Sequence, residues 1–115
     1  MSMLEVLFVG VSDVERILVE NYLDIPIHAT VANNTSQARN HLQHKASCVA
    51  IFDAEVPGLD VRKLLSDGKF HQYIILSSRD SDIERRKSLL KSRERYLTRP
   101  YSEKQFCHAF HAALH

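Results

Sequence analysis

The chain has 115 residues, a net charge of +1 and 44% hydrophobic residues, which fits one globular domain with a single core. No apolar run approaches the roughly 18 residues that a membrane-spanning helix needs, and the N-terminus lacks the basic flank and cleavage site of a signal peptide. We therefore expect a single domain over residues 1–115 that is cytoplasmic and does not contact a membrane. Cys48 and Cys107 show no metal-ligand or disulfide spacing and are interpreted as reduced packing residues.

Strands and helices are predicted to alternate along the whole chain. Apolar runs rich in β-branched residues indicate strands over residues 4–9, 27–31, 48–52, 73–76 and 96–98. Capping residues and periodic apolar positions indicate helices that begin near residues 12, 36, 61, 81 and 102. Parallel strands need crossover connections, which are almost always right-handed. The pattern therefore predicts an α/β fold, with a five-stranded parallel sheet and helices on both faces.

Two of the predicted helices carry the clearest patterns. Ser12 and Glu15 have the spacing of a capping box, in which the serine accepts a hydrogen bond and the glutamate reaches back. The inward face of that helix is predicted to be Val14, Ile17, Leu18 and Tyr22. The last helix opens with a similar box, and its buried stripe is predicted to be Phe106, Ala109, Phe110, Ala113 and Leu114.

Asp53 directly follows the most apolar strand, residues 48–52. A carboxylate at the carboxyl end of a parallel strand lies where ligands bind in open α/β sheets, because loops and helix N-termini converge there. An aspartate in this position can also do no more than begin a turn through its own side chain. The position alone leaves both interpretations open.

Several features in the same order resemble a response-regulator receiver domain, the phospho-acceptor module of two-component signalling. Asp53 is followed by the residues PG at 57–58 and by Asp60, with the spacing of that family. Ser77 ends the fourth strand, where the family has Ser or Thr, and residues 96–101, YLTRPY, resemble its closing strand and Lys-Pro turn. The resemblance covers nearly the whole chain.

The resemblance implies a flavodoxin-like sheet of order 2-1-3-4-5 with a site at its carboxyl edge. Asp53 would be the phosphoryl acceptor, and Ser77 and Tyr96 would be switch residues that move together. Arg99 stands where the family has its lysine and would pair with the phosphoryl group or with the carboxylate. Pro100 would follow a cis peptide bond.

The acidic pair that holds Mg²⁺ in the family is replaced here by Gly10 and Val11. A site with three carboxylates and one lysine has a net charge near −2, which a divalent cation neutralises, whereas Asp53 and Arg99 together sum to about zero. We therefore expect no metal ligands and no cofactor, with Mg²⁺ binding weak or absent. Phosphoryl transfer depends on cancelling charge, so phosphorylation should be slow or absent.

Two nearby carboxylates could restore part of the missing charge. Asp13 is interpreted first as a residue of the first helical turn that the helix dipole favours, and second as a site residue. Glu55 is interpreted as an exposed modulator beside Asp53. Arg99 could grip a phosphoryl group with its paired donors, but a standing salt bridge to Asp53 is the favoured alternative.

The last third of the chain is more basic than the first. Residues 79–99 carry eight Lys or Arg against four Asp or Glu, on a segment that corresponds to the partner surface of the family formed by helix 4, strand 5 and helix 5. A solvated helix face is the simpler interpretation. No helix-turn-helix or aromatic basic patch suggests direct nucleic-acid binding, and His108, His111 and His115 lack the context of a zinc motif.

The sequence therefore predicts a non-enzymatic, receiver-like signalling domain of a bacterial response regulator that is atypical at its metal site. It would act through protein interaction or dimerisation, with a histidine kinase, an output domain or a second copy as partner. The alternative is a working receiver phosphorylated at Asp53 by a histidine kinase, which controls a transcriptional output domain.

Overall fold

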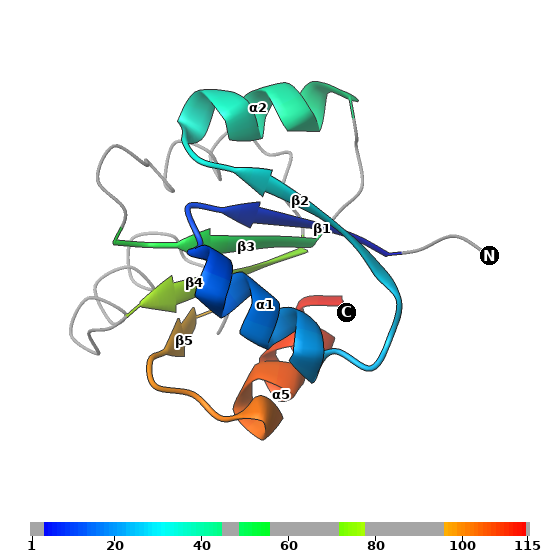
Figure 1. Cartoon of the computed structure of the whole chain (residues 1–115), viewed down its shortest axis with the longest axis vertical. Coiled ribbons are helices and arrows are strands. Elements are labelled where there is room, and N and C mark those ends of the chain that lie inside the picture. Colours follow the sequence, from blue (N-terminus) through cyan, green and yellow to red (C-terminus); the bar gives the residue numbers. More distant parts are fainter. Residues whose placement is uncertain (1–3, 45–48, 56–71, 78–95, 115) are drawn as a thin grey trace.

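The computed structural model describes residues 4–44, 49–55, 72–77 and 96–114 (Figure 1). Five parallel strands form one sheet in the order β2-β1-β3-β4-β5. The predicted sheet order and strand direction are confirmed, and the strand ends differ from the predicted ones by one residue or less. The strands are β1 Leu4–Val9, β2 Ile27–Ala32, β3 Val49–Asp53, β4 Gln72–Ser77 and β5 Tyr96–Thr98.

Helices cover both faces of this sheet, as predicted. The helices α1 Asp13–Tyr22 and α5 Glu103–Leu114 lie together on one face, and α2 Thr35–His44 packs on the other (Figure 1). The helices predicted to begin near residues 61 and 81 lie outside the described residues. No helix in the described part of the chain has both the length and the hydropathy needed to cross a membrane.

Alternate residues of the central strands point to opposite faces and fill two separate cores. In β1, Val6 and Phe8 pack on the side of α1 and α5, whereas Leu7 and Val9 pack on the side of α2. Strands buried on both faces must be apolar at consecutive positions, which explains the uninterrupted apolar runs in the sequence. The larger core contains Val6, Phe8, Val11, Val19, Val49, Ile51, Ile74, Leu76, Phe106, Phe110 and Ala113.

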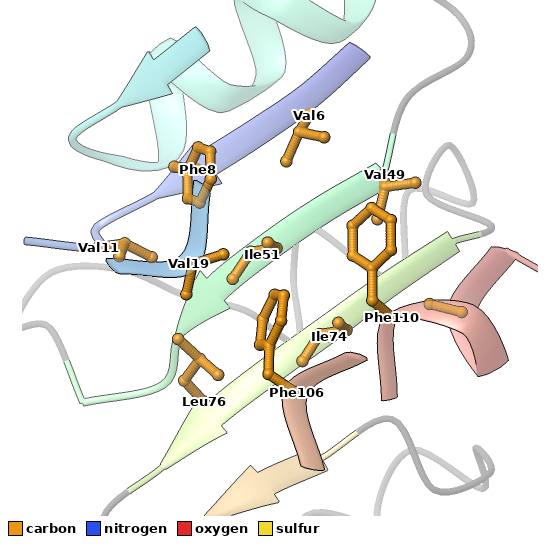
Figure 2. Close-up of a cluster of buried hydrophobic side chains, with 11 residues drawn as sticks. Val6, Phe8, Val11, Val19, Val49, Ile51, Ile74, Leu76, Phe106 and Phe110 are labelled. Atoms are coloured by element: carbon orange, nitrogen blue, oxygen red, sulfur yellow. The ribbon is translucent and has the colours of Figure 1, made fainter. Parts of the chain in front are cut away.

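The predicted stripe of α5 is confirmed. Phe106, Phe110 and Ala113 are buried, and Figure 2 shows both phenylalanine side chains lying over the central strands. The capping box that opens this helix is also present, because Ser102 N donates to Gln105 Oε1 at 2.8 Å and Gln105 N donates to Ser102 Oγ at 3.1 Å. The helix is thus fixed at its start and along its buried face.

The predicted inward face of α1 is right for Tyr22, which packs against the larger core, and wrong for the other three residues. Val14, Ile17 and Leu18 are exposed, by 80%, 52% and 44%, whereas Val19 is fully buried. Val11, two residues before the helix, and Val19 both belong to the larger core, and Glu15 lies between them in sequence. Residues 14, 17 and 18 do share a face, but it is the outer face, because the sheet is contacted by positions 11, 15 and 19.

Paired substitutions on α1 test this assignment. Val19→Ala should lower the free energy of unfolding by about 2 kcal/mol, because it leaves a cavity in the core. Val14→Ala should change it by less than about 0.5 kcal/mol and can raise it, because alanine has the higher helix propensity and no burial is lost. Urea denaturation of both variants provides the measurement. Equal losses would contradict the observed orientation of the helix.

Cys107 of α5 is half-buried, and its thiol donates to the carbonyl oxygen of Tyr22 at 3.4 Å. Burial raises the pKa of this thiol, and the nearby carboxylates of Glu103 and Asp24 raise it further. A raised pKa disfavours the reactive thiolate, which agrees with the packing role expected for Cys107. Cys48 lies outside the described residues.

Candidate functional site

Polar side chains gather at the carboxyl edge of the sheet, where the described strands end. Asp53 is the last residue of β3, Ser77 is the last residue of β4, and Arg99 directly follows β5. The backbone keeps these ends in register, because Ala54 N donates to Leu76 O at 2.9 Å and Arg99 N donates to Ser77 O at 2.8 Å. Parallel strands thus bring residues that are far apart in sequence to one place, as the resemblance implied.

The centre of the site is the guanidinium group of Arg99, which contacts two carboxylates. Nη2 donates to Asp53 Oδ2 at 2.9 Å and to Glu15 Oε1 at 2.8 Å, and Nε donates to Glu15 Oε2 at 3.0 Å. The side chains are 22%, 17% and 16% exposed for Arg99, Asp53 and Glu15, so the ion pairs are largely shielded from water. The salt bridge between Arg99 and Asp53 that sequence reasoning favoured is present.

Tyr101 completes this network from the turn after β5. Its hydroxyl group donates to Glu15 Oε2 at 2.6 Å, so the Glu15 carboxylate accepts three hydrogen bonds from Arg99 and Tyr101. The Arg99–Pro100 peptide bond between these donors is cis, the geometry expected at that position. The network therefore joins the first turn of α1 to the β5–α5 turn and to the end of β3.

The ion pairs shift the pKa values of all three groups around Glu15. Burial by itself would raise the pKa of Glu15, but hydrogen bonds from Arg99 and Tyr101 and the charge of Arg99 lower it overall. The hydrogen bond to Glu15 is the main cause of a raised pKa at Arg99. Burial and then the same carboxylate raise the pKa of the Tyr101 phenol. Glu15 is therefore a carboxylate and Arg99 a cation at neutral pH.

The lowered pKa of Glu15 predicts a dependence of stability on pH. Because the pKa is lower in the folded state than in the unfolded state, ionised Glu15 stabilises the fold above the unfolded value, and this contribution disappears as the pH falls through the folded value. The free energy of unfolding should fall more steeply between roughly pH 5 and pH 3 in the wild-type protein than in Glu15→Gln. Urea denaturation across that range measures both slopes, and equal slopes would contradict the prediction.

The second oxygen of Asp53 is also engaged. The backbone N–H of Glu55 donates to Asp53 Oδ1 at 2.8 Å, and the carboxylate of Glu55 accepts a hydrogen bond from Ser77 Oγ at 3.1 Å. Ser77 is fully buried, whereas Glu55 is exposed, as predicted for a residue beside Asp53. Both oxygens of Asp53 thus have protein donors, and the Ser77 hydroxyl group is directed to a neighbouring carboxylate.

The described residues do not fit the Mg²⁺ site that the resemblance would otherwise imply. Mg²⁺ requires an octahedral set of oxygens close to 2.1 Å, usually one or two carboxylates together with water and phosphate oxygens. Gly10 has no side chain and adopts φ 73°, a value that suits glycine, while Val11 is apolar and buried in the core. The site sums to about −2 and not to the zero expected from Asp53 and Arg99 alone, but the carboxylates of Asp53 and Glu15 already pair with Arg99, and that of Glu55 accepts from Ser77. No group of three metal-ligating side chains occurs within the described ranges.

The other candidate residues are less central. Asp13 is 84% exposed and lies 3.7 Å from Arg16, so it remains a first-turn helix residue and not a second acid for Asp53. His108 and His111 are exposed on α5. Tyr96 lies in β5 beside Ile75. The side chain of Tyr96, His115 and the basic residues of the segment 79–95 lie outside the described part of the chain.

Sequence reasoning missed Glu15 and Tyr101. Only half of the predicted capping box at Ser12 is present: Ser12 Oγ accepts from Glu15 N at 3.2 Å, but the Glu15 carboxylate turns to Arg99. The available signal was helical spacing, since position 15 lies one turn from each of two buried valines, Val11 and Val19. A carboxylate on a buried helix face needs a cation as its partner, and Arg99, at the same edge of the sheet, supplies it.

The fold is that of response-regulator receiver domains. Chemotaxis response regulator CheY4 of Vibrio cholerae superposes with a TM-score of 0.76 at 19% identity, covering 97% of this chain and 99% of that one. The signal receiver domain of an HD domain-containing protein from Pseudomonas fluorescens Pf-5 gives a TM-score of 0.79 at 22% identity, covering 99% and 88%.

Full-length FixJ of B. japonicum is similar in the same way, with a TM-score of 0.76 at 16% identity. The similarity covers 99% of this chain but 59% of FixJ, so the shared fold is one part of that longer protein. No protein-family model and no curated protein sequence matches the chain. These similarities establish the fold, and the chemistry of the site must be argued from its own residues.

Proposed function

We propose that this chain is a receiver-like signalling domain of a bacterial two-component system that works without Mg²⁺ and acts through protein contacts, not as an enzyme. The observation that carries the proposal is the position of Arg99 Nη2, which donates to both Asp53 and Glu15. Arg99, at the position where the family has its lysine, already pairs with two carboxylates at the edge of the sheet. In this proposal the domain functions in the cytoplasm, with a histidine kinase, an output domain or a second copy as partner.

The pairing of charges at the site, and not their sum, argues against efficient phosphorylation of Asp53. Glu15, Asp53 and Glu55 carry three negative charges and Arg99 carries one positive charge, so the sum near −2 equals that of a metal-binding receiver site, but two of the three carboxylates already pair with Arg99. A phosphoryl group on Asp53 would add further negative charge, and phosphoryl transfer depends on cations that neutralise the equatorial oxygens. Arg99 is already paired with two carboxylates, so little of its charge is left for this purpose.

The exposed side of α1 supports a role in protein contacts. Val14, Ile17 and Leu18 form an apolar stripe on the outer face of this helix, and apolar surface of this kind is typical of interaction sites. Of the surface formed by helix 4, strand 5 and helix 5, which the sequence offered as a partner surface, the structure describes β5 and α5, whereas helix 4 lies outside the described residues. Both surfaces remain part of the proposal.

Incubation with acetyl phosphate and Mg²⁺, followed by intact-mass measurement, tests the proposal. We expect no added phosphoryl group on the wild-type chain, while a receiver domain with a complete acidic pair gains one under the same conditions. A mass gain that disappears in Asp53→Asn would contradict the proposal. It would establish the alternative, a working phospho-acceptor at Asp53.

A further inference from the structure

Glu15 occupies the part of Arg99 that is best suited to bind an oxyanion. Arg99 Nε and Nη2 donate to the two oxygens of the Glu15 carboxylate at 3.0 and 2.8 Å, which is the paired geometry by which arginine binds carboxylate and phosphate. Asp53 receives a single hydrogen bond from Nη2. Glu15 is therefore the principal partner of the guanidinium group, and Asp53 is the secondary one.

The donors around Glu15 lie close together on one short segment of the chain. Arg99 and Tyr101 are two residues apart, and their three N–H and O–H groups converge on one carboxylate. The ring of Tyr101 packs against buried Phe106 with a centroid distance of 5.9 Å. The donors thus come from one supported segment, whereas the acceptor comes from α1.

We propose that Arg99 and Tyr101 form an oxyanion-binding site that the Glu15 carboxylate fills as an internal ligand. The ligand class is a tetrahedral oxyanion such as phosphate, bound without a metal ion. The site is open only when Glu15 is removed or withdrawn. This inference rests on the proposed function, because it assigns the regulation of the same site to Glu15 and not to Asp53.

An internal carboxylate is a strong competitor for this site. Because the folded chain holds Glu15 next to Arg99, the effective concentration of its carboxylate there is about millimolar or higher. A free anion must exceed that concentration to displace Glu15. The approach of an anion also meets the negative charge of Asp53, which lies on the same guanidinium nitrogen. Loss of Glu15 frees both bidentate donors and the phenol, whereas loss of the Asp53 charge leaves them occupied.

Titration with inorganic phosphate in the absence of Mg²⁺, followed by NMR of the Arg99 side chain and the backbone amides, tests the inference. Glu15→Ala should bind phosphate about tenfold or more tightly than the wild-type chain, because the paired N–H donors of Arg99 and the Tyr101 hydroxyl group become available to the anion. Glu20→Ala is the matched control on the same helix, because its carboxylate pairs with Arg16 at 2.8 Å and not with Arg99. This control should bind like the wild-type chain.

Removal of the Asp53 charge discriminates between the two carboxylates. Asp53→Asn alone should leave phosphate binding within about threefold of wild type, because Glu15 still occupies the paired donors of Arg99 and the Tyr101 hydroxyl group. The double variant with Glu15→Ala should bind most tightly. The inference would be overturned if Glu15→Ala bound phosphate no more tightly than Glu20→Ala. It would also be overturned if Asp53→Asn gained as much affinity for phosphate as Glu15→Ala.

Two further measurements keep the result interpretable. Far-UV circular dichroism reports whether Glu15→Ala is folded. If this variant does not fold, Glu15→Gln, which keeps the side-chain volume, takes its place, and a smaller gain in phosphate affinity is expected. Intact mass after acetyl phosphate identifies the source of the anion in Glu15→Ala. An unchanged mass with phosphate binding supports free phosphate, and a gain abolished by Asp53→Asn supports an aspartyl phosphate. Failure of the proposed function instead appears as phosphorylation of the wild-type chain.

Discussion

Replacement of Arg99 by alanine is expected to lower the free energy of unfolding by about 2–3 kcal/mol. The substitution leaves the Glu15 and Asp53 carboxylates, each less than one-fifth exposed, without their shared cation. Breaking a fully buried pair costs about 3–5 kcal/mol, and the partial exposure of Arg99 reduces that figure through solvent screening. Urea denaturation at neutral pH measures the loss.

Two comparison variants separate the contribution of the Arg99 network to stability from that of an ordinary surface arginine. Arg99→Lys should lose about half as much, because lysine keeps the charge but not the paired donors. Arg16→Ala removes an arginine of similar exposure that pairs with Glu20 along α1, and should cost less than about 1 kcal/mol. If Arg99→Ala costs no more than Arg16→Ala, the network at the sheet edge is not a stabilising one.

Replacement of Phe106 by alanine is expected to have the largest effect on stability, about 3–4 kcal/mol. Phe106 is fully buried, and its ring centroid lies 6.2 Å from that of Tyr22, 5.9 Å from that of Tyr101 and 6.0 Å from that of Phe110. Figure 2 shows Phe106 and Phe110 in the core. The cavity would remove the support of Tyr101, so the hydrogen bond from its hydroxyl group to Glu15 should weaken as well. Urea denaturation measures the first effect, and the pH dependence of stability measures the second.

The exposed His108 on the same helix provides the control for Phe106. His108→Ala should change the free energy of unfolding by less than about 0.5 kcal/mol and leave the pH dependence unaltered. A loss below about 1 kcal/mol for Phe106→Ala would show that the core between α5 and the sheet is less tightly packed than its burial indicates.

The sheet could be predicted from sequence because its central strands are buried on both faces. Residues 6–9 and 49–52 are apolar at consecutive positions, so the strands are easy to locate. The face of α1 was less predictable, because apolar residues occur on two sides of this helix. Periodicity identified Val14, Ile17 and Leu18 as a stripe, but it cannot say whether a stripe contacts the sheet or a partner.

The site could be predicted only for residues that end strands. Asp53 and Ser77 follow apolar runs, and Arg99 precedes a proline, so local sequence marks their positions. Glu15 follows no such rule, because its partner lies 84 residues away in sequence and its spacing from Ser12 matches a simple helix cap. A contact that exists only after folding leaves no local pattern in the sequence.

The first helix carries the outer apolar stripe and the inner carboxylate on adjacent residues, Val14 and Glu15. A helix moves as a nearly rigid body, so a protein that binds the apolar stripe and tilts α1 must also move the Glu15 carboxylate. Such a motion would loosen the hold on Arg99 and leave Asp53 as its main counter-charge. A protein bound to the outer face of α1 would thereby change the charge balance around Arg99 and Asp53 without contacting either residue.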